Sequence, residues 1–157
     1  MKKIGIVAVI ASLLIVLCAS CNKVTIKCGV YGKVTKRVGN WMPGANDPSA
    51  QEYPIECEVA VFDSINIHDL QGYWIYWMDR VAISDLNIHE IARTSTNNKG
   101  IYQLEIPAGK YSIALVDGDT LLRRSLSGGD GYGWMEPLEL FDGELRERNI
   151  VLDYAAY

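Results

Sequence analysis

Apolar and polar side chains alternate with a period of two along much of the chain after residue 22. The even-numbered positions from Val24 to Val34 are apolar or small, and the segments Ile55–Phe62 and Leu86–Thr94 are also rich in apolar residues. Successive side chains of a strand point to opposite faces of a sheet, so this pattern predicts half-buried strands. No apolar period of 3.6 residues persists after residue 22, and the chain is therefore predicted to be all-β.

The segment Thr94–Gly118 shows the pattern most clearly and reads as turn, strand, turn, strand, turn. Asn97–Gly100 is rich in residues that tolerate a positive φ, which indicates a turn. Apolar side chains then alternate from Tyr102 to Ile106, and again from Tyr111 to Leu115. The residues Pro107–Gly109 lie between the two runs and predict a reversal of the chain. The segment is thus expected to form a hairpin.

Further turns divide the rest of the chain into short strands. Asp117–Asp119 is typical of a hairpin turn, and Asp142-Gly143 is expected to join the strands Leu138–Phe141 and Arg148–Leu152. Seven or eight short strands separated by such turns predict an antiparallel Greek-key β-sandwich.

Two aromatic stretches leave alternatives open. Trp41 and Met42 lie in a Gly- and Pro-containing loop, where they would either plug one end of the core or form a ligand-facing patch. The polar segment 45–53 after them is expected to be an exposed excursion. The segment 73–78 has strong β propensity without clean alternation, and it would form either a packed strand or an exposed surface for a partner. The candidate residues of that surface are Tyr73, Trp74, Tyr76 and Trp77.

The first 20 residues have the pattern of a secretory signal peptide. Lys2 and Lys3 precede an apolar run that is shorter than the ~20 residues of a membrane-spanning helix, and small residues follow it. The sequence Cys18-Ala19-Ser20-Cys21 resembles a bacterial lipobox, with Cys18 where leucine is usual. This pattern predicts a lipid attached to Cys21 and a mature domain spanning residues 21–157. Several acyl chains would hold such a protein on a bilayer.

The acidic charge of the mature domain argues against nucleic acid as a partner. Removal of residues 1–20 takes away two lysines and no acid, which leaves 13 basic and 19 acidic side chains and a formal charge of −6. Nucleic acid binding requires clustered Lys and Arg. The expected location is the cell envelope, at the outer membrane facing the periplasm, with the membrane as a partner through the lipid.

Two other cysteines, Cys28 and Cys57, share the phase of the apolar residues in their own predicted strands. Disulfides persist in compartments outside the cytosol. The pair would either form a bridge between the first two strands or remain as two buried free thiols.

No pattern in the sequence indicates a catalytic or metal site. His68 and His89 lie in two similar short segments, but two histidines without ligand spacing favour chance resemblance over a metal site. The carboxylates of Asp117, Asp119 and Asp130 do not have the regular spacing of a calcium loop. We therefore expect no catalytic residue, metal or cofactor.

The segment Asn98–Ser112 resembles the signature of carboxypeptidase regulatory-like domains, which are transthyretin-like (prealbumin-like) β-sandwiches. The segment Gly29–Val34 resembles the opening strand of this family, and the Gly39–Pro43 loop and the Tyr-Ala-Ala-Tyr ending resemble small lipoproteins of Bacteroidetes-type bacteria. The family is mostly non-catalytic and accessory. The resemblance therefore implies a non-catalytic envelope lipoprotein that binds a protein or glycan, with a purely structural role or a hydrolase of the cell envelope as alternatives.

Overall fold

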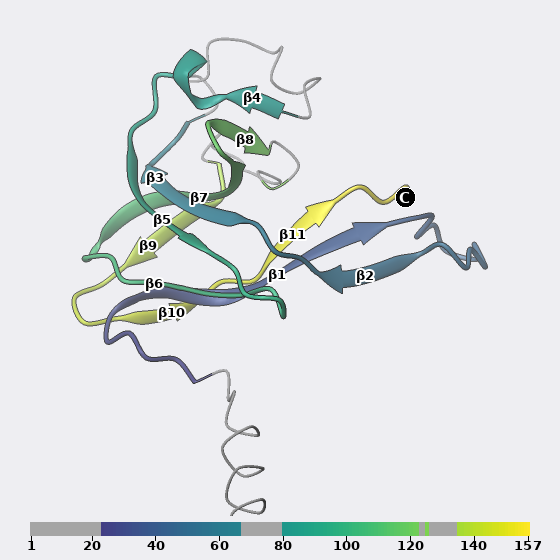
Figure 1. Ribbon diagram of the computed structural model, residues 1–157, viewed down its shortest axis with the longest axis horizontal. Coiled ribbons are helices and arrows are strands. Elements are labelled where there is room, and N and C mark those ends of the chain that lie inside the picture. Colours follow the sequence, from purple (N-terminus) through teal and green to yellow (C-terminus); the bar gives the residue numbers. More distant parts are fainter. Residues whose placement is uncertain (1–22, 67–79, 123–124, 126–134) are drawn as a thin grey trace, which may run out of the picture.

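The computed structural model describes residues 23–66, 80–122, 125 and 135–157, and these residues form two packed β-sheets (Figure 1). The strands in chain order are β1 (Gly29–Val38), β2 (Gln51–Pro54), β3 (Glu58–Asp63), β4 (Arg80–Ala82), β5 (Glu90–Ser95), β6 (Ile101–Leu104), β7 (Gly109–Asp117), β8 (Thr120–Leu122), β9 (Pro137–Leu140), β10 (Leu145–Glu147) and β11 (Ile150–Asp153). One 3-10 turn, Ile83–Asp85, follows β4. The predicted all-β sandwich is confirmed.

Sheet 1 is built around the long strand β1. Along one edge β1 pairs with β6 and then β2, both antiparallel, and along the other edge it pairs with β10 and then β11, both parallel. Sheet 2 has the order β4-β8-β7-β3-β5, and β9 joins the same edge of β7 as β8. The two parallel pairings are a feature that the purely antiparallel prediction lacked.

The predicted hairpin of Thr94–Gly118 is wrong, because its two strands enter different sheets. Strand β6 pairs with β1 in sheet 1, whereas β7 pairs with β3 in sheet 2. The Pro107–Gly109 turn therefore carries the chain across the core from one sheet to the other. The Tyr111 hydroxyl donates to the carbonyl oxygens of Pro107 (3.2 Å) and Ala108 (3.4 Å), which ties this crossing to the start of β7.

The same correction applies at Asp142-Gly143. The turn forms, with the amide of Glu144 donating to the carbonyl oxygen of Phe141 at 3.0 Å, but it connects β9 of sheet 2 to β10 of sheet 1. By contrast, the predicted hairpin at Asp117–Asp119 is confirmed, because β7 and β8 pair directly on either side of it.

Sheet 2 is buried on both faces. Its inner face meets sheet 1 in a core that includes Val34, Val61, Tyr102 and Leu115. A second cluster around Phe62, Ala114 and Leu121 lies on the opposite face of sheet 2, where Ile83, Leu86 and Ile88 pack against it. As a result, six consecutive residues of β7 are buried, which alternation alone did not predict. The outer face of sheet 1 is the one that faces solvent.

Candidate functional site

One end of sheet 1 reaches beyond sheet 2 (Figure 1). We call this part the overhang; it comprises the end of β1 with the loop and strand that follow, residues 35–54, and β11 with the tail, residues 151–157. The alternation of β1 continues into it, so Lys36 has the same phase as the core residues Val30 and Val34. A lysine is tolerated there because sheet 2 does not cover that position.

The outer face of the overhang is organised around Arg37. Its guanidinium donates to Glu52 Oε2 from two nitrogens at 3.0 and 2.8 Å and to the Tyr157 hydroxyl oxygen at 2.8 Å. The Tyr157 hydroxyl donates in turn to Asp153 Oδ2 at 2.6 Å. The tyrosine and the carboxylate favour the charged guanidinium, and so raise the pKa of Arg37 above its ordinary value. This network joins β1 to β2 and to the tail.

Trp41 packs on this network from the loop after β1. The Arg37 guanidinium carbon lies 4.9 Å from the centre of the Trp41 ring, and the indole Nε1 donates to the carbonyl oxygen of Val38 at 2.8 Å. The rest of the loop is fixed by Asp47, whose carboxylate accepts from the amides of Asn40 and Ser49. Trp41 remains 39% exposed and Met42 45% exposed, so the two residues form a patch and do not plug the core.

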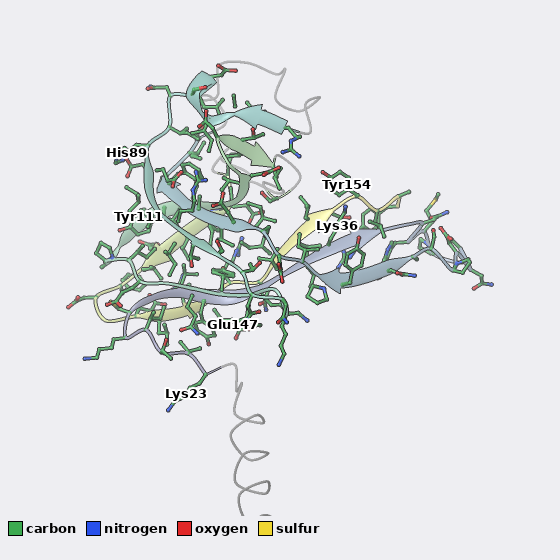
Figure 2. The ribbon with its side chains drawn as sticks, in the orientation of Figure 1. Lys23, Lys36, His89, Tyr111, Glu147 and Tyr154 are labelled. Atoms are coloured by element: carbon green, nitrogen blue, oxygen red, sulfur yellow. The ribbon has the colours of Figure 1, made fainter. Side chains whose placement is uncertain are left out.

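The opposite, inner face of the overhang carries a cation between two tyrosines. Lys36 Nζ lies 5.1 Å from the centre of the Tyr154 ring, and Tyr53 is the cross-strand partner of Lys36 on β2 (Figure 2). Tyr53 is exposed. The predicted excursion of residues 45–53 is thus exposed, but its last residues form strand β2.

Sequence reasoning did not find this site. It expected a packed ending, which holds for Tyr154, partly buried against the core, and is wrong for Tyr157, which is 64% exposed. It also ended the first strand at Val34, before Lys36 and Arg37. Lys36 interrupts the apolar alternation, and Val38 alone is an apolar residue that continues the pattern beyond it. The predicted partner surface of Tyr73, Trp74, Tyr76 and Trp77 lies outside the described residues, as do Cys21, His68 and Asp130.

A groove lies next to the overhang on the outer face of sheet 1. Its volume is about 450 Å³. It is bounded by the extended segment before β1, by β1 itself, and by residues of the strands that pair with β1 along its two edges. The lining mixes apolar side chains such as Val24 and Ile101 with the charged Lys33 and Glu147. The charged side chains among its described lining residues are Lys33, Glu52 and Glu147.

Of the two alternatives for Cys28 and Cys57, the structure has the free thiols, and both residues are half-buried. Cys28 precedes the first residue of β1. Cys57 lies near the opposite end of the shared core. The amide of Ile55, two residues before Cys57, donates to the carbonyl oxygen of Val34. Val34 is six residues after Cys28, which is roughly 20 Å along an extended strand. Burial raises the pKa of the Cys57 thiol, which makes it a poor nucleophile.

The remaining candidates for metal chemistry are not brought together. His89 pairs with Asp63 at 3.2 Å, and both side chains are well exposed. Asp117 forms an ion pair with Arg80. Among residues 23–66, 80–122, 125 and 135–157 there is no group of three or more His, Cys, Asp or Glu side chains that could hold a metal ion.

The network at Arg37 predicts a pH dependence of stability. Hydrogen bonds from the Thr35 hydroxyl and from Arg37 hold the pKa of Glu52 below its usual 4.5. A carboxyl group with a lowered pKa stabilises the fold above its unfolded pKa, and this contribution is lost as the pH falls through the folded value. Glu52→Gln is therefore expected to lower the free energy of unfolding by no more than about 1 kcal/mol at pH 7, because the pair is partly exposed.

Urea denaturation at several pH values measures this difference. The gap between the wild type and Glu52→Gln should close as the pH falls from about 4.5 toward acid. Glu105→Gln, a matched change at an exposed residue of the same sheet, should have little effect at any pH. A gap that persists unchanged into acid would contradict the proposed role of the Glu52 carboxylate.

No helix in the described part of the chain is long and apolar enough to cross a membrane. The solvent-facing sheet 1, with its overhang and groove, is the feature of the described fold that a binding function can use. Comparison with known proteins adds no relative, because no protein-family model, no curated protein and no solved structure matches the chain.

Proposed function

We propose that the protein is a non-catalytic lipoprotein of the bacterial cell envelope, tethered through a lipid on Cys21, and that its overhang binds a partner protein. The lipobox at residues 18–21 supports the tether, and the apolar run before it supports export. The resemblance to carboxypeptidase regulatory-like domains supports an accessory role. On this proposal the sandwich is the rigid carrier of the binding surface, located at the outer membrane and facing the periplasm.

The observation that carries the binding role is the gathering of exposed apolar side chains on the overhang. Six large hydrophobic side chains are exposed in the described residues, and four of them lie on the overhang: Trp41 and Tyr157 beside Arg37 on its outer face, Met42 in the loop, and Tyr53 on its inner face. A concentration of exposed apolar side chains marks an interaction site, whereas scattered single residues do not. We assign the inner face, with Tyr53 and Tyr154, to the partner protein. Tyrosine and tryptophan are also the residues that most often dominate binding energy.

The strands and the loop of the overhang are joined by hydrogen bonds of their own. The Arg37 network fixes its two outer strands to β1, and Asp47 fixes the loop. A surface that is ordered in advance loses less conformational entropy on binding. The inner face, with Tyr53, Lys36 and Tyr154, offers two aromatic rings beside a cation, which suits a partner with apolar and acidic groups.

Capture of partners from a native envelope extract tests this function. The double variant Tyr53→Ala/Tyr154→Ala is expected to retain roughly tenfold less partner than the wild type, because two aromatic contacts are removed. Phe141→Ala is the matched control, since Phe141 is a well exposed aromatic side chain, at 63%, that lies outside the overhang, in the turn between β9 and β10.

The outcomes separate the alternatives. A protein retained by the wild type and by Phe141→Ala, but lost from the double variant, supports the proposal. Equal retention by all three proteins would contradict it. A glycan captured in place of a protein, with the same dependence on Tyr53 and Tyr154, would replace the protein partner by a carbohydrate.

A further inference from the structure

The positive charge of the mature domain is concentrated at its beginning. Residues 23–38 contain five basic side chains and no acid, whereas residues 39–157 contain the other eight basic side chains and all 19 acids. The first part thus has a formal charge of +5 and the remainder a charge of −11. The segment directly after the proposed anchor is therefore positively charged, whereas the rest of the domain is negatively charged.

The structure holds the part of this segment before β1 against the outer face of sheet 1, whereas Lys36 lies on the inner face. The side chain of Gln103, on β6, accepts from the Thr25 amide at 2.7 Å and donates to the carbonyl oxygen of Lys23 at 3.1 Å. Gln103 is the cross-strand partner of Tyr31, so its side chain belongs to the outer face. The segment before β1 is therefore held across that face, and Lys23 projects on the side away from sheet 2 (Figure 2).

The distance from this tie to the predicted lipid site is short. Cys21 precedes Lys23 by two residues, and two trans peptide units span at most about 7 Å. A lipid on Cys21 would thus begin close to the outer face of sheet 1, and the hydrogen bonds of Gln103 would keep the domain from swinging freely about its anchor.

The same face carries groups suited to a lipid surface along its length. Lys23, Lys27 and Lys33 are exposed near the anchor. At the far end the indole of Trp41 stacks on Arg37, whose side chain lies on the outer face of β1. Amphipathic aromatic rings of this kind favour the interface between lipid and water. The acids on this face are Glu52 and Asp153, which contact Arg37, Glu147, which accepts from Asn149, and the exposed Glu105.

From these positions we infer that the outer face of sheet 1 lies flat on a bilayer of anionic phospholipids, with Lys23, Lys27 and Lys33 against the headgroups and Trp41 at the interface. The inference rests on the proposed lipidation of Cys21. It leaves the inner face of the overhang, with Tyr53 and Tyr154, directed away from the bilayer and open to a partner. The acids of sheet 2, such as Glu58 on β3 and Glu139 on β9, are then turned away from the negative lipid surface.

Lysine footprinting of the lipidated protein tests the orientation. The protein is placed in detergent, in phosphatidylcholine vesicles, and in vesicles that also contain phosphatidylglycerol, and a membrane-impermeant acylating reagent is added. Lys33 should react several-fold more slowly in the anionic vesicles than in detergent. Lys110 on sheet 2, whose side chain is 76% exposed, should react at the same rate in every preparation.

A charge variant tests the role of the basic segment. Each basic side chain near an anionic membrane contributes roughly a five-fold preference, so Lys23→Gln/Lys27→Gln should shift the balance between flat and lifted orientations by about 25-fold. Lys33 should then recover its reactivity. The matched variant Arg80→Gln/Lys110→Gln removes the same charge from sheet 2 and should leave Lys33 protected.

Three results would overturn the inference in distinguishable ways. Equal reactivity of Lys33 in detergent and in anionic vesicles would show that this face does not meet the bilayer. Equal protection of Lys33 with and without phosphatidylglycerol would show that the contact with the bilayer is not electrostatic. A protein that fails to float with the vesicles and carries no lipid by intact mass would refute the proposed anchor itself, which the first two results leave standing.

Discussion

Cys21→Ser is expected to abolish incorporation of fatty acid into the protein. The lipobox pattern assigns the thiol of Cys21 as the attachment point, and a hydroxyl at that position does not replace a thiolate nucleophile. When cells are fed an alkyne-tagged fatty acid, the labelled wild-type band should therefore fall to background in this variant. Loss of the acyl chains removes a membrane affinity of about 0.8 kcal/mol for each buried methylene group.

Cys18→Ser is the matched control, since it changes the other cysteine of the same motif. Leu17 before Cys18 is bulky where a small residue is required, so Cys18 is not expected to carry the lipid. The control should label as strongly as the wild type. Labelling that survives in Cys21→Ser and disappears in Cys18→Ser would place the lipid on Cys18 and contradict the assignment to Cys21.

Gly32→Ala is expected to be among the most destabilising single substitutions in sheet 1. A Cβ atom at this position would lie 2.0 Å from the carbonyl oxygen of Arg148 and 3.2 Å from the ring of Tyr102. Arg148 lies between β10 and β11, where its amide donates to the carbonyl oxygen of Tyr31 at 2.8 Å. The backbone of the parallel edge would have to move, at a cost of about 3 kcal/mol or more in the free energy of unfolding.

Gly44→Ala separates this steric effect from a general sensitivity of glycines. Gly44 has a φ of +84°, but nothing lies within 4 Å of an added Cβ atom. Its cost should be limited to the backbone strain of about 1–2 kcal/mol. Urea denaturation followed by circular dichroism compares the two variants, and a Gly32→Ala protein as stable as Gly44→Ala would contradict the close contact between β1 and Arg148.

Alternation of apolar residues predicted the fold class but not the partners of each strand. The residues Tyr102 to Leu115 have the pattern of a hairpin, and the turn between them does form. Which sheet each strand enters depends on contacts with β1 and β3, which are distant in sequence. A local pattern does not contain that information. The directly paired strands around Gly118 were predictable because a two-residue turn fixes their register.

The overhang could not be predicted from the sequence for a related reason. Lys36 and Arg37 look like the polar end of a strand, because a lysine at a core-phase position normally ends the buried pattern. Only the three-dimensional structure shows that β1 continues to Val38 at the edge of the core, where its residues are half-buried. Trp41 and Tyr157 meet at Arg37 on the outer face and Tyr53 lies beside Lys36 on the inner face, because three segments distant in sequence come together around the end of β1.

The sequence could not decide between a Cys28–Cys57 bridge and two free thiols, because it did not show how far along its strand each cysteine lies. Both residues have the phase of the core, as predicted, and both are partly buried. The position of a residue in the alternating pattern shows only which face of the sheet its side chain lies on. The hydrogen bond between Ile55 and Val34 sets how far along β1 the second cysteine lies, and this pairing could not be read from either segment alone.

The intact mass of the protein purified from its native envelope decides whether the lipid anchor exists. We expect a chain that begins at Cys21 and carries a diacylglyceryl group, with residues 1–20 removed. The anchor, the flat orientation of sheet 1 and the accessibility of the overhang all depend on that product. A mature chain without added lipid, or a chain that retains residues 1–20, would contradict the proposed tether.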